Sequence, residues 1–146
     1  MGRIPVNLLT GFLGSGKTTL LNHWVQLPAL AGSAVLVNEF GDVGIDHHLV
    51  DRVDEQMVLL DSGCLCCAMQ GDLIGALKNL ALRASRREIP PVTRVIVETT
   101  GLADPVPVIY TLMEDPFVAA RYVCDGVVTV VSATHGVQQL REFAEA

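Results

Sequence analysis

The sequence predicts an α/β fold in which helices flank a mostly parallel β-sheet. Short apolar runs of strand length alternate along the chain with segments whose apolar residues recur at helical spacing. The first unit consists of a strand, a glycine-rich turn and a helix. Alternation of this kind is typical of parallel sheets covered by helices, and it places the glycine turn at the carboxyl end of a strand, where such sheets bind ligands.

Each element is predicted from its own local pattern. Strands are predicted where short, mostly apolar runs are bounded by polar, glycine or proline residues, and they cover residues 4–9, 34–37, 57–60, 92–97 and 127–131. Helices are predicted where apolar residues recur three and four positions apart, and they cover residues 17–26, 69–83, 105–113 and 136–144. The segments 38–54, 61–68 and 99–104 are predicted to be loops, and a loop as long as 38–54 inside a compact domain is often functional.

Composition restricts the class of protein. The 146 residues are predicted to form one domain, because half of them are hydrophobic and can bury a core without disulfides. A net charge of −6 argues against a surface for duplex nucleic acid, which needs a basic face. No apolar run is long enough to span a membrane and no export signal opens the chain, so we expect a cytoplasmic location. Residues 142–146 carry no helix-stop signal, and we expect the chain to be a fragment of a longer protein.

Residues 11–18 read Gly-Phe-Leu-Gly-Ser-Gly-Lys-Thr and match the Walker A pattern G-x-x-x-x-G-K-[ST] at every specified position. Glycines let backbone N–H groups approach phosphate oxygens, and the helix that follows adds its positive N-terminal end. Lys17 would reach the β- and γ-phosphates, and the Thr18 hydroxyl would bind Mg²⁺. The pattern therefore predicts binding of a nucleoside triphosphate with Mg²⁺. The predicted contacts are made by Gly11, Gly14, Ser15, Gly16, Lys17, Thr18 and Thr19.

A second nucleotide motif follows the apolar run 92–97, which leads into Glu98-Thr99-Thr100-Gly101. In P-loop proteins an acid at such a strand end holds or orients Mg²⁺. The N–H of Gly101 is placed to contact a γ-phosphate and to sense its loss. The alternative is a strand that ends in a solvated glutamate, and the preceding Walker A pattern favours the nucleotide interpretation.

Three of the four cysteines crowd together in Gly63-Cys64-Leu65-Cys66-Cys67, whereas Cys124 stands alone and is predicted to be a core residue. Thiolates are soft ligands that suit Zn²⁺ and similar ions. A C-x-C-C segment cannot easily direct three sulfur atoms at one tetrahedral centre. A metal site made of two of these cysteines and a ligand from elsewhere in the chain is easier to form. A redox switch and inert buried thiols are the competing interpretations. The candidate outside ligands are Glu39, Asp42, Asp46, His47 and His48, and for the two adjacent histidines a plain surface role is favoured.

Taken together, these motifs resemble the CobW-type metallochaperone GTPases, a family of metal-handling P-loop GTPases. The matching segments are residues 9–19, 38–46, 63–67 and 98–105, and they fall in the family's order and spacing. The resemblance implies a GTPase that couples hydrolysis of GTP to delivery of Zn²⁺ or Co²⁺ to a client metalloprotein or a metal-cofactor assembly enzyme. It also implies that the chain is a GTPase domain, residues 1–146, that lacks the family's guanine-reading motif and C-terminal domain.

The resemblance assigns roles to individual residues. Segments 38–46 and 98–104 would be the two switch loops, and Lys17, Thr18 and Glu98 would support hydrolysis. Cys66 and Cys67, with Cys64 and a contribution from Glu39, would match the metal site. Ser132 stands where relatives commonly carry aspartate, and we have no firm interpretation of that change.

Two other classes of function share part of this pattern. A P-loop kinase would explain residues 11–18 but not the three clustered cysteines. A binding module would hold nucleotide and metal without turnover. No arginine finger is evident in the sequence, so fast hydrolysis would need a partner or a homodimer.

Overall fold

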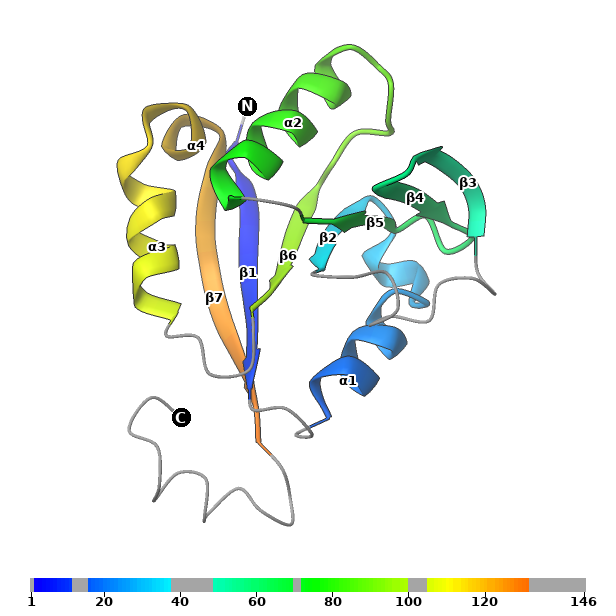
Figure 1. The fold of residues 1–146 in the computed structure, drawn as a ribbon, viewed down its shortest axis with the longest axis horizontal. Helices are drawn as coiled ribbons and strands as arrows, with labels where there is room; N and C mark the ends of the chain where they lie inside the picture. Colours follow the sequence, from blue (N-terminus) through cyan, green and yellow to red (C-terminus); the bar gives the residue numbers. More distant parts are fainter. Residues whose placement is uncertain (1, 12–15, 38–48, 70–71, 100–104, 132–146) are drawn as a thin grey trace.

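The computed structural model of the chain describes residues 2–11, 16–37, 49–69, 72–99 and 105–131 (Figure 1). Within these residues lies a seven-stranded sheet of order β3-β4-β5-β2-β6-β1-β7. The strands are β1 Ile4–Gly11, β2 Ser33–Val37, β3 Leu49–Asp54, β4 Met57–Leu60, β5 Leu65–Ala68, β6 Arg94–Glu98 and β7 Tyr122–Val130. The helices are α1 Lys17–Trp24, the short 3₁₀ helix Pro28–Leu30, α2 Leu73–Ser85, α3 Pro105–Glu114 and α4 Pro116–Arg121.

The predicted mostly parallel sheet is confirmed. Strands β5, β2, β6, β1 and β7 pair in parallel. Only β3 and β4, at one end of the sheet, pair antiparallel to their neighbours. The central strands are buried on both faces, which explains why their sequences are continuous apolar runs rather than alternating ones.

Helices cover both faces of the sheet, with α1 on one side and α2, α3 and α4 on the other (Figure 1). Successive strand residues point to opposite faces, so Leu8 packs in one core and Leu9 in the other. We call the side covered by α1 the α1 core; its buried residues are Leu9, Leu21, Val25, Val35, Val37, Val58, Leu60, Cys64, Cys66 and Ile96. The opposite side is the α2–α4 core, to which those helices contribute Leu77, Leu80, Leu112 and Val118.

The prediction of a loop over residues 61–68 is wrong for residues 65–68, which form β5. Only residues 61–64 make the turn between β4 and β5, where Gly63 has a φ of 90° and its N–H donates to the carbonyl of Leu60 at 3.0 Å. Leu65 and Cys67 pack in the α2–α4 core and Cys66 packs in the α1 core. The strand is only four residues long, Leu-Cys-Cys-Ala, and contains no β-branched or aromatic residue, so it gave no strand signal.

The predicted loop 38–54 also contains a strand, because its last six residues form β3. This strand pairs antiparallel with β4 only, and its sequence Leu-Val-Asp-Arg-Val-Asp carries three charges. Charged residues are depleted in central strands but are tolerated at a sheet edge, so the charges masked the strand in the sequence.

Helix α4 was not predicted, although its start signals are present. The Asp115 side chain caps the helix by accepting a hydrogen bond from the Val118 N–H at 3.0 Å, and Pro116 occupies the first helical position. Six residues are too few to display a helical repeat. The predicted helix 136–144 and Ser132 lie outside the described residues.

Strand β7 begins at Tyr122, five residues before the predicted start at Val127, and it contains a bulge. Val6 pairs with Cys124 but Asn7 pairs with Gly126, so Asp125 is the extra residue. The Arg94 guanidinium on β6 donates to the Asn7 side-chain carbonyl and to the Asp125 carboxylate, the latter at 3.2 Å. Among the described residues β7 is the edge strand of the sheet next to β1, opposite the edge formed by β3, and its Val127 and Val128 are 38% and 37% exposed.

No helix among the described residues combines the length and the apolar character that crossing a membrane requires.

Candidate nucleotide and metal site

The carboxyl ends of three parallel strands meet the beginning of α1 at one edge of the sheet (Figure 1). Gly11, the last residue of β1, pairs with Val130 at the end of β7. On the other side of β1, Leu9 pairs with Glu98 at the end of β6. Open parallel sheets bind ligands outside this edge, so the topology brings the two predicted nucleotide motifs together.

Lys17 is the first residue of α1 and is only 6% exposed. Its ammonium nitrogen donates to the carbonyl oxygen of Thr99 at 2.7 Å. Thr99 is itself fixed, because its N–H and its hydroxyl both donate to the carbonyl of Leu9, at 2.9 and 3.1 Å. A buried ammonium group requires such a partner. The side chain of Lys17 is therefore held at the end of β6, directly after Glu98.

Glu98, the predicted Mg²⁺-organising acid, is the last residue of β6 and is 3% exposed. A carboxylate this deeply buried is expected to function as part of a polar site rather than as a solvated strand end. Thr18 and Thr19, by contrast, are exposed at the start of α1. The predicted contacts Gly14, Ser15, Gly101 and Glu39 lie outside the described residues, as do Asp42, Asp46, His47 and His48.

Gly16 precedes α1 in a left-handed conformation, with φ of 101° and ψ of 8°. Its carbonyl accepts the first helical hydrogen bond, from the Leu20 N–H at 2.9 Å. No side chain caps the helix and no acidic residue lies in its first turn. The N–H groups of that turn and the positive end of the helix dipole are therefore suited to an anion.

Gly16→Ala is expected to lower the free energy of unfolding by about 1–2 kcal/mol, because an L-residue is strained in the left-handed region. Space is not the cause, since the nearest atom to an added Cβ would be Val130 Cγ1 at 3.9 Å. Urea denaturation measures the change. Gly2→Ala is the matched control, since a Cβ there meets nothing within 4 Å. Equal stability of the two variants would contradict this account.

The three clustered cysteines are not joined by disulfides and are buried, with exposed fractions of 1% for Cys64, 0% for Cys66 and 5% for Cys67. Cys64 and Cys66 belong to the α1 core, whereas Cys67 belongs to the α2–α4 core. The fold thus brings Cys64 and Cys66 to one face of the sheet and places Cys67 on the other. Among the described residues, no group of three or more His, Cys, Asp or Glu side chains is arranged to hold a metal ion.

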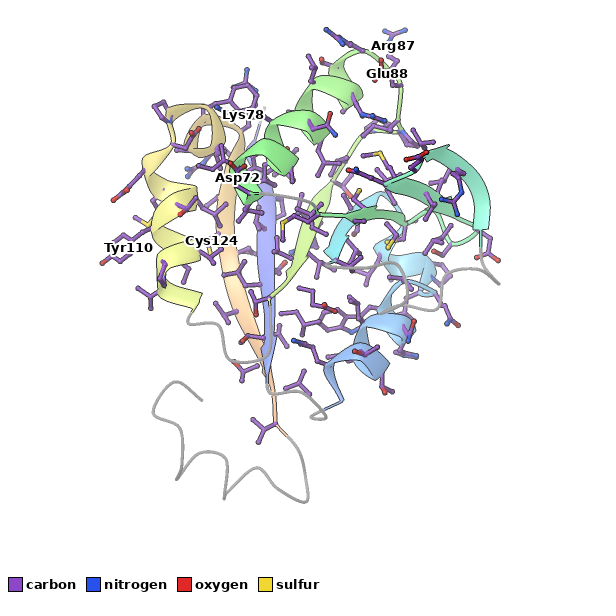
Figure 2. All side chains as sticks on the ribbon, viewed as in Figure 1. Asp72, Lys78, Arg87, Glu88, Tyr110 and Cys124 are labelled. Carbon is purple, nitrogen blue, oxygen red and sulfur yellow. The ribbon has the colours of Figure 1, made fainter. Side chains whose placement is uncertain are left out.

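Burial also affects the chemistry of these thiols. It raises the pKa of Cys64 from 9.0 to about 12. A metal binds the thiolate form, so binding of a metal at Cys64 would release the proton of this thiol. Cys124 is half-buried on β7 and packs against the α2–α4 core (Figure 2). Three strands, β2, β6 and β1, separate β7 from β5.

The end of the cysteine strand is joined to β2. The N–H of Met69 donates to the carbonyl of Val37, the last residue of β2, at 2.7 Å. The sequence that follows Val37 is the segment predicted as the first switch loop. Neither this hydrogen bond nor the one between Lys17 and the Thr99 carbonyl could be predicted from the sequence, because both acceptors are backbone atoms.

The chain begins with a strand, a glycine-rich segment and a helix, and the first residue of this helix is a buried lysine at the carboxyl end of a parallel sheet. This arrangement defines a P-loop nucleotide-binding domain. The chain belongs to the CobW/HypB/UreG family, whose nucleotide-binding domain matches residues 5–145.

Curated relatives include the zinc chaperone YjiA of Escherichia coli K12, which is 40% identical over 146 residues, all of this chain and 46% of YjiA. The zinc-regulated GTPase metalloprotein activator 1 of Schizosaccharomyces pombe is 36% identical over 134 residues, 88% of this chain and 31% of that protein. The chain therefore spans less than half the length of these relatives.

Two solved structures of E. coli YjiA share the fold. The Zn(II)-bound YjiA GTPase superposes with a TM-score of 0.82 at 40% identity, covering 100% of this chain and 46% of that one. A Zn(II)-bound triple mutant of YjiA, in which one glutamate and two cysteines are replaced by alanine, superposes with a TM-score of 0.83 at 38% identity and the same coverage.

Proposed function

We propose that this chain is the nucleotide-binding domain of a GTP-hydrolysing zinc metallochaperone. The observation that carries the proposal is the buried Lys17, held directly after Glu98 at the end of β6, in the same fold as a strand with two buried cysteines. The names of the relatives, a zinc chaperone and a zinc-regulated GTPase, support both halves of the proposal.

In the nucleotide half, GTP with Mg²⁺ is the substrate. Lys17 would exchange the Thr99 carbonyl for the β- and γ-phosphates, and the exposed Thr18 hydroxyl would bind Mg²⁺. Glu98 would order the Mg²⁺ shell or the attacking water. Water attacks the γ-phosphorus, the bond to the β–γ bridging oxygen breaks, and GDP and phosphate leave. The backbone N–H groups of Gly11, Gly14, Ser15, Gly16, Thr19 and Gly101 would contact the phosphates.

In the metal half, Zn²⁺ is the cargo and Co²⁺ is the second candidate. Cys66 and Cys67, with Cys64 and Glu39, supply the thiolate and carboxylate donors that such ions prefer. Hydrolysis would change the geometry of this site and pass the ion to a client metalloprotein or a cofactor-assembly enzyme. The Zn(II)-bound YjiA variant lacks one glutamate and two cysteines and still binds zinc, so the number of bound ions, rather than zinc binding itself, is the informative quantity.

Replacing Cys66 and Cys67 together by alanine is expected to reduce bound zinc by about one ion per chain, because the proposed site then loses two of its four donors and a stable zinc site in a protein needs at least three. Native mass spectrometry of anaerobically purified protein, loaded with Zn²⁺ in the presence of GTP and Mg²⁺, measures the stoichiometry. Cys124→Ala is the matched control, since it removes a thiol from β7, which three strands separate from β5. If the double variant and the control hold equal zinc, the metal half of the proposal is wrong.

A further inference from the structure

We propose that the carboxyl end of β5 is a latch that must separate from β2 and β4 before zinc is bound. The inference rests on the proposed metal function and specifies how the site is regulated. Its starting point is the placement of Cys66 and Cys67 on opposite faces of the sheet. Zinc–sulfur bonds are about 2.3 Å long, so two sulfur atoms on one ion lie within about 4 Å of each other. Side chains separated by the backbone of a paired strand cannot meet that limit.

Strand β5 is held on both sides. Cys66 and Cys67 pair with Val35 and Leu36 of β2, and with Val58 and Met57 of β4. Beyond Cys67, two backbone hydrogen bonds fasten the end of the strand. The Ala68 N–H donates to the Gln56 carbonyl at 2.8 Å, and the Met69 N–H donates to the Val37 carbonyl at 2.7 Å. As long as these bonds persist, Cys67 stays on the face opposite Cys66.

The same end of β5 is the part of the strand with room to move. A cleft of about 160 Å³ opens between β4, β5 and α2, and Cys67, Ala68 and Met69 line it together with Gln56 and Arg83. Cys66 on the other face has an exposed fraction of 0%. The cleft lies on the face of Cys67, so release of Ala68 and Met69 would let the end of β5 twist into it. That twist would bring the sulfur atoms of Cys66 and Cys67 together without disturbing the pairing of β1 with β6.

The end of β5 is also connected to a segment that is predicted to contact the nucleotide. Val37 accepts the Met69 hydrogen bond, and Val37 directly precedes the predicted first switch loop. A change in the position of the Val37 carbonyl therefore strengthens or weakens its hydrogen bond with the Met69 N–H. GTP binding and zinc binding would be coupled through this one backbone contact.

The kinetics of zinc uptake test the latch. Stopped-flow measurement with Zn²⁺ alone is expected to give a rate that reaches a plateau as Zn²⁺ is raised, because opening precedes binding. Met69→Pro removes the N–H donor and is expected to raise the plateau about tenfold, the effect of losing one hydrogen bond. Met69→Ala, which keeps the N–H, is the matched control and is expected to leave the plateau unchanged. A rate that rises linearly with Zn²⁺, or equal plateaus in the two variants, would overturn the latch.

Hydrogen exchange on the parent protein gives an independent reading if the proline variant does not fold. Zinc loading is expected to increase exchange at the amides of Ala68 and Met69 while the amides of β1 and β6 stay protected. Bound zinc with unchanged protection at these two amides would overturn the latch but leave the metal function intact. A parent protein that binds no zinc, with or without GTP and Mg²⁺, would overturn the proposed metal function and the latch with it.

Discussion

Lys17→Ala is expected to reduce the affinity for GTP by at least about a hundredfold. A charge-assisted hydrogen bond contributes about 1.5–3 kcal/mol, and Lys17 would make such bonds to both the β- and γ-phosphates. No other lysine can substitute, since Lys17 and Lys78 are the only two in the chain. Lys78 lies on α2, where it pairs with Asp115 at 3.8 Å and is 48% exposed. Fluorescence anisotropy with a labelled GTP analogue measures the affinity.

The same experiment tests the enzymatic part of the proposal. Phosphate release from GTP by the parent protein, together with its loss in Lys17→Ala, is expected of a GTPase. Lys78→Ala is the matched control and is expected to change neither quantity by more than about twofold, because an exposed ion pair contributes little. GTP binding that survives Lys17→Ala would refute the assignment of residues 11–18. Binding without phosphate release in the parent would instead favour a binding module.

Leu8→Ala is expected to lower the free energy of unfolding by about 3–4 kcal/mol, the largest stability effect we foresee. Leu8 lies in the middle of β1, has an exposed fraction of 0% and packs in the α2–α4 core. Its removal leaves a cavity between the sheet and the helices that cannot collapse, since β1 is paired on both sides. Domains of this size are stable by only about 5–15 kcal/mol. Urea denaturation followed by circular dichroism measures the loss.

Leu82→Ala provides the comparison for Leu8→Ala. Leu82 is on α2 but is 47% exposed, so its truncation leaves no cavity. We expect a change within about 0.5 kcal/mol, as is usual for surface substitutions. Similar losses in the two variants would show that packing against β1 does not dominate the stability of this domain.

Most of the sheet could be predicted because its central strands are buried on both faces. The runs around Val35 and Val97 are apolar without interruption, the run around Leu8 is interrupted only by Asn7, and each is bounded by turn residues. Strand β3 could not be found in the same way, because its charges suit an edge strand and a loop equally well. Strand β5 was missed because cysteines carry a functional interpretation that competes with their ordinary role as small buried residues.

The positions in the fold of the predicted nucleotide residues could be anticipated better than those of the predicted metal residues. Lys17 and Glu98 belong to motifs whose spacing requires a particular backbone, and the structure places both residues at the expected edge of the sheet. Cys66 and Cys67 were considered as part of a loop, where adjacent side chains can converge. In the strand β5, successive side chains point to opposite faces of the sheet, so the side chains of Cys66 and Cys67 are separated. The partner of Lys17 is a carbonyl oxygen, which every residue has, so no sequence pattern could have identified Thr99.

The two halves of the edge strand β7 differ in how well they are protected from pairing with another chain, and this difference affects aggregation at high protein concentration. The bulge at Asp125 and its pairing with Arg94 interrupt the first half of this strand, and such features discourage another chain from adding to an edge. The valine-rich second half has no such protection among the described residues, and its Val127, Val128 and Thr129 side chains are exposed. Backbone hydrogen bonding to a foreign strand is therefore favoured at residues 127–130. Aggregation of the isolated domain is expected to begin there and to be suppressed by whatever covers that segment.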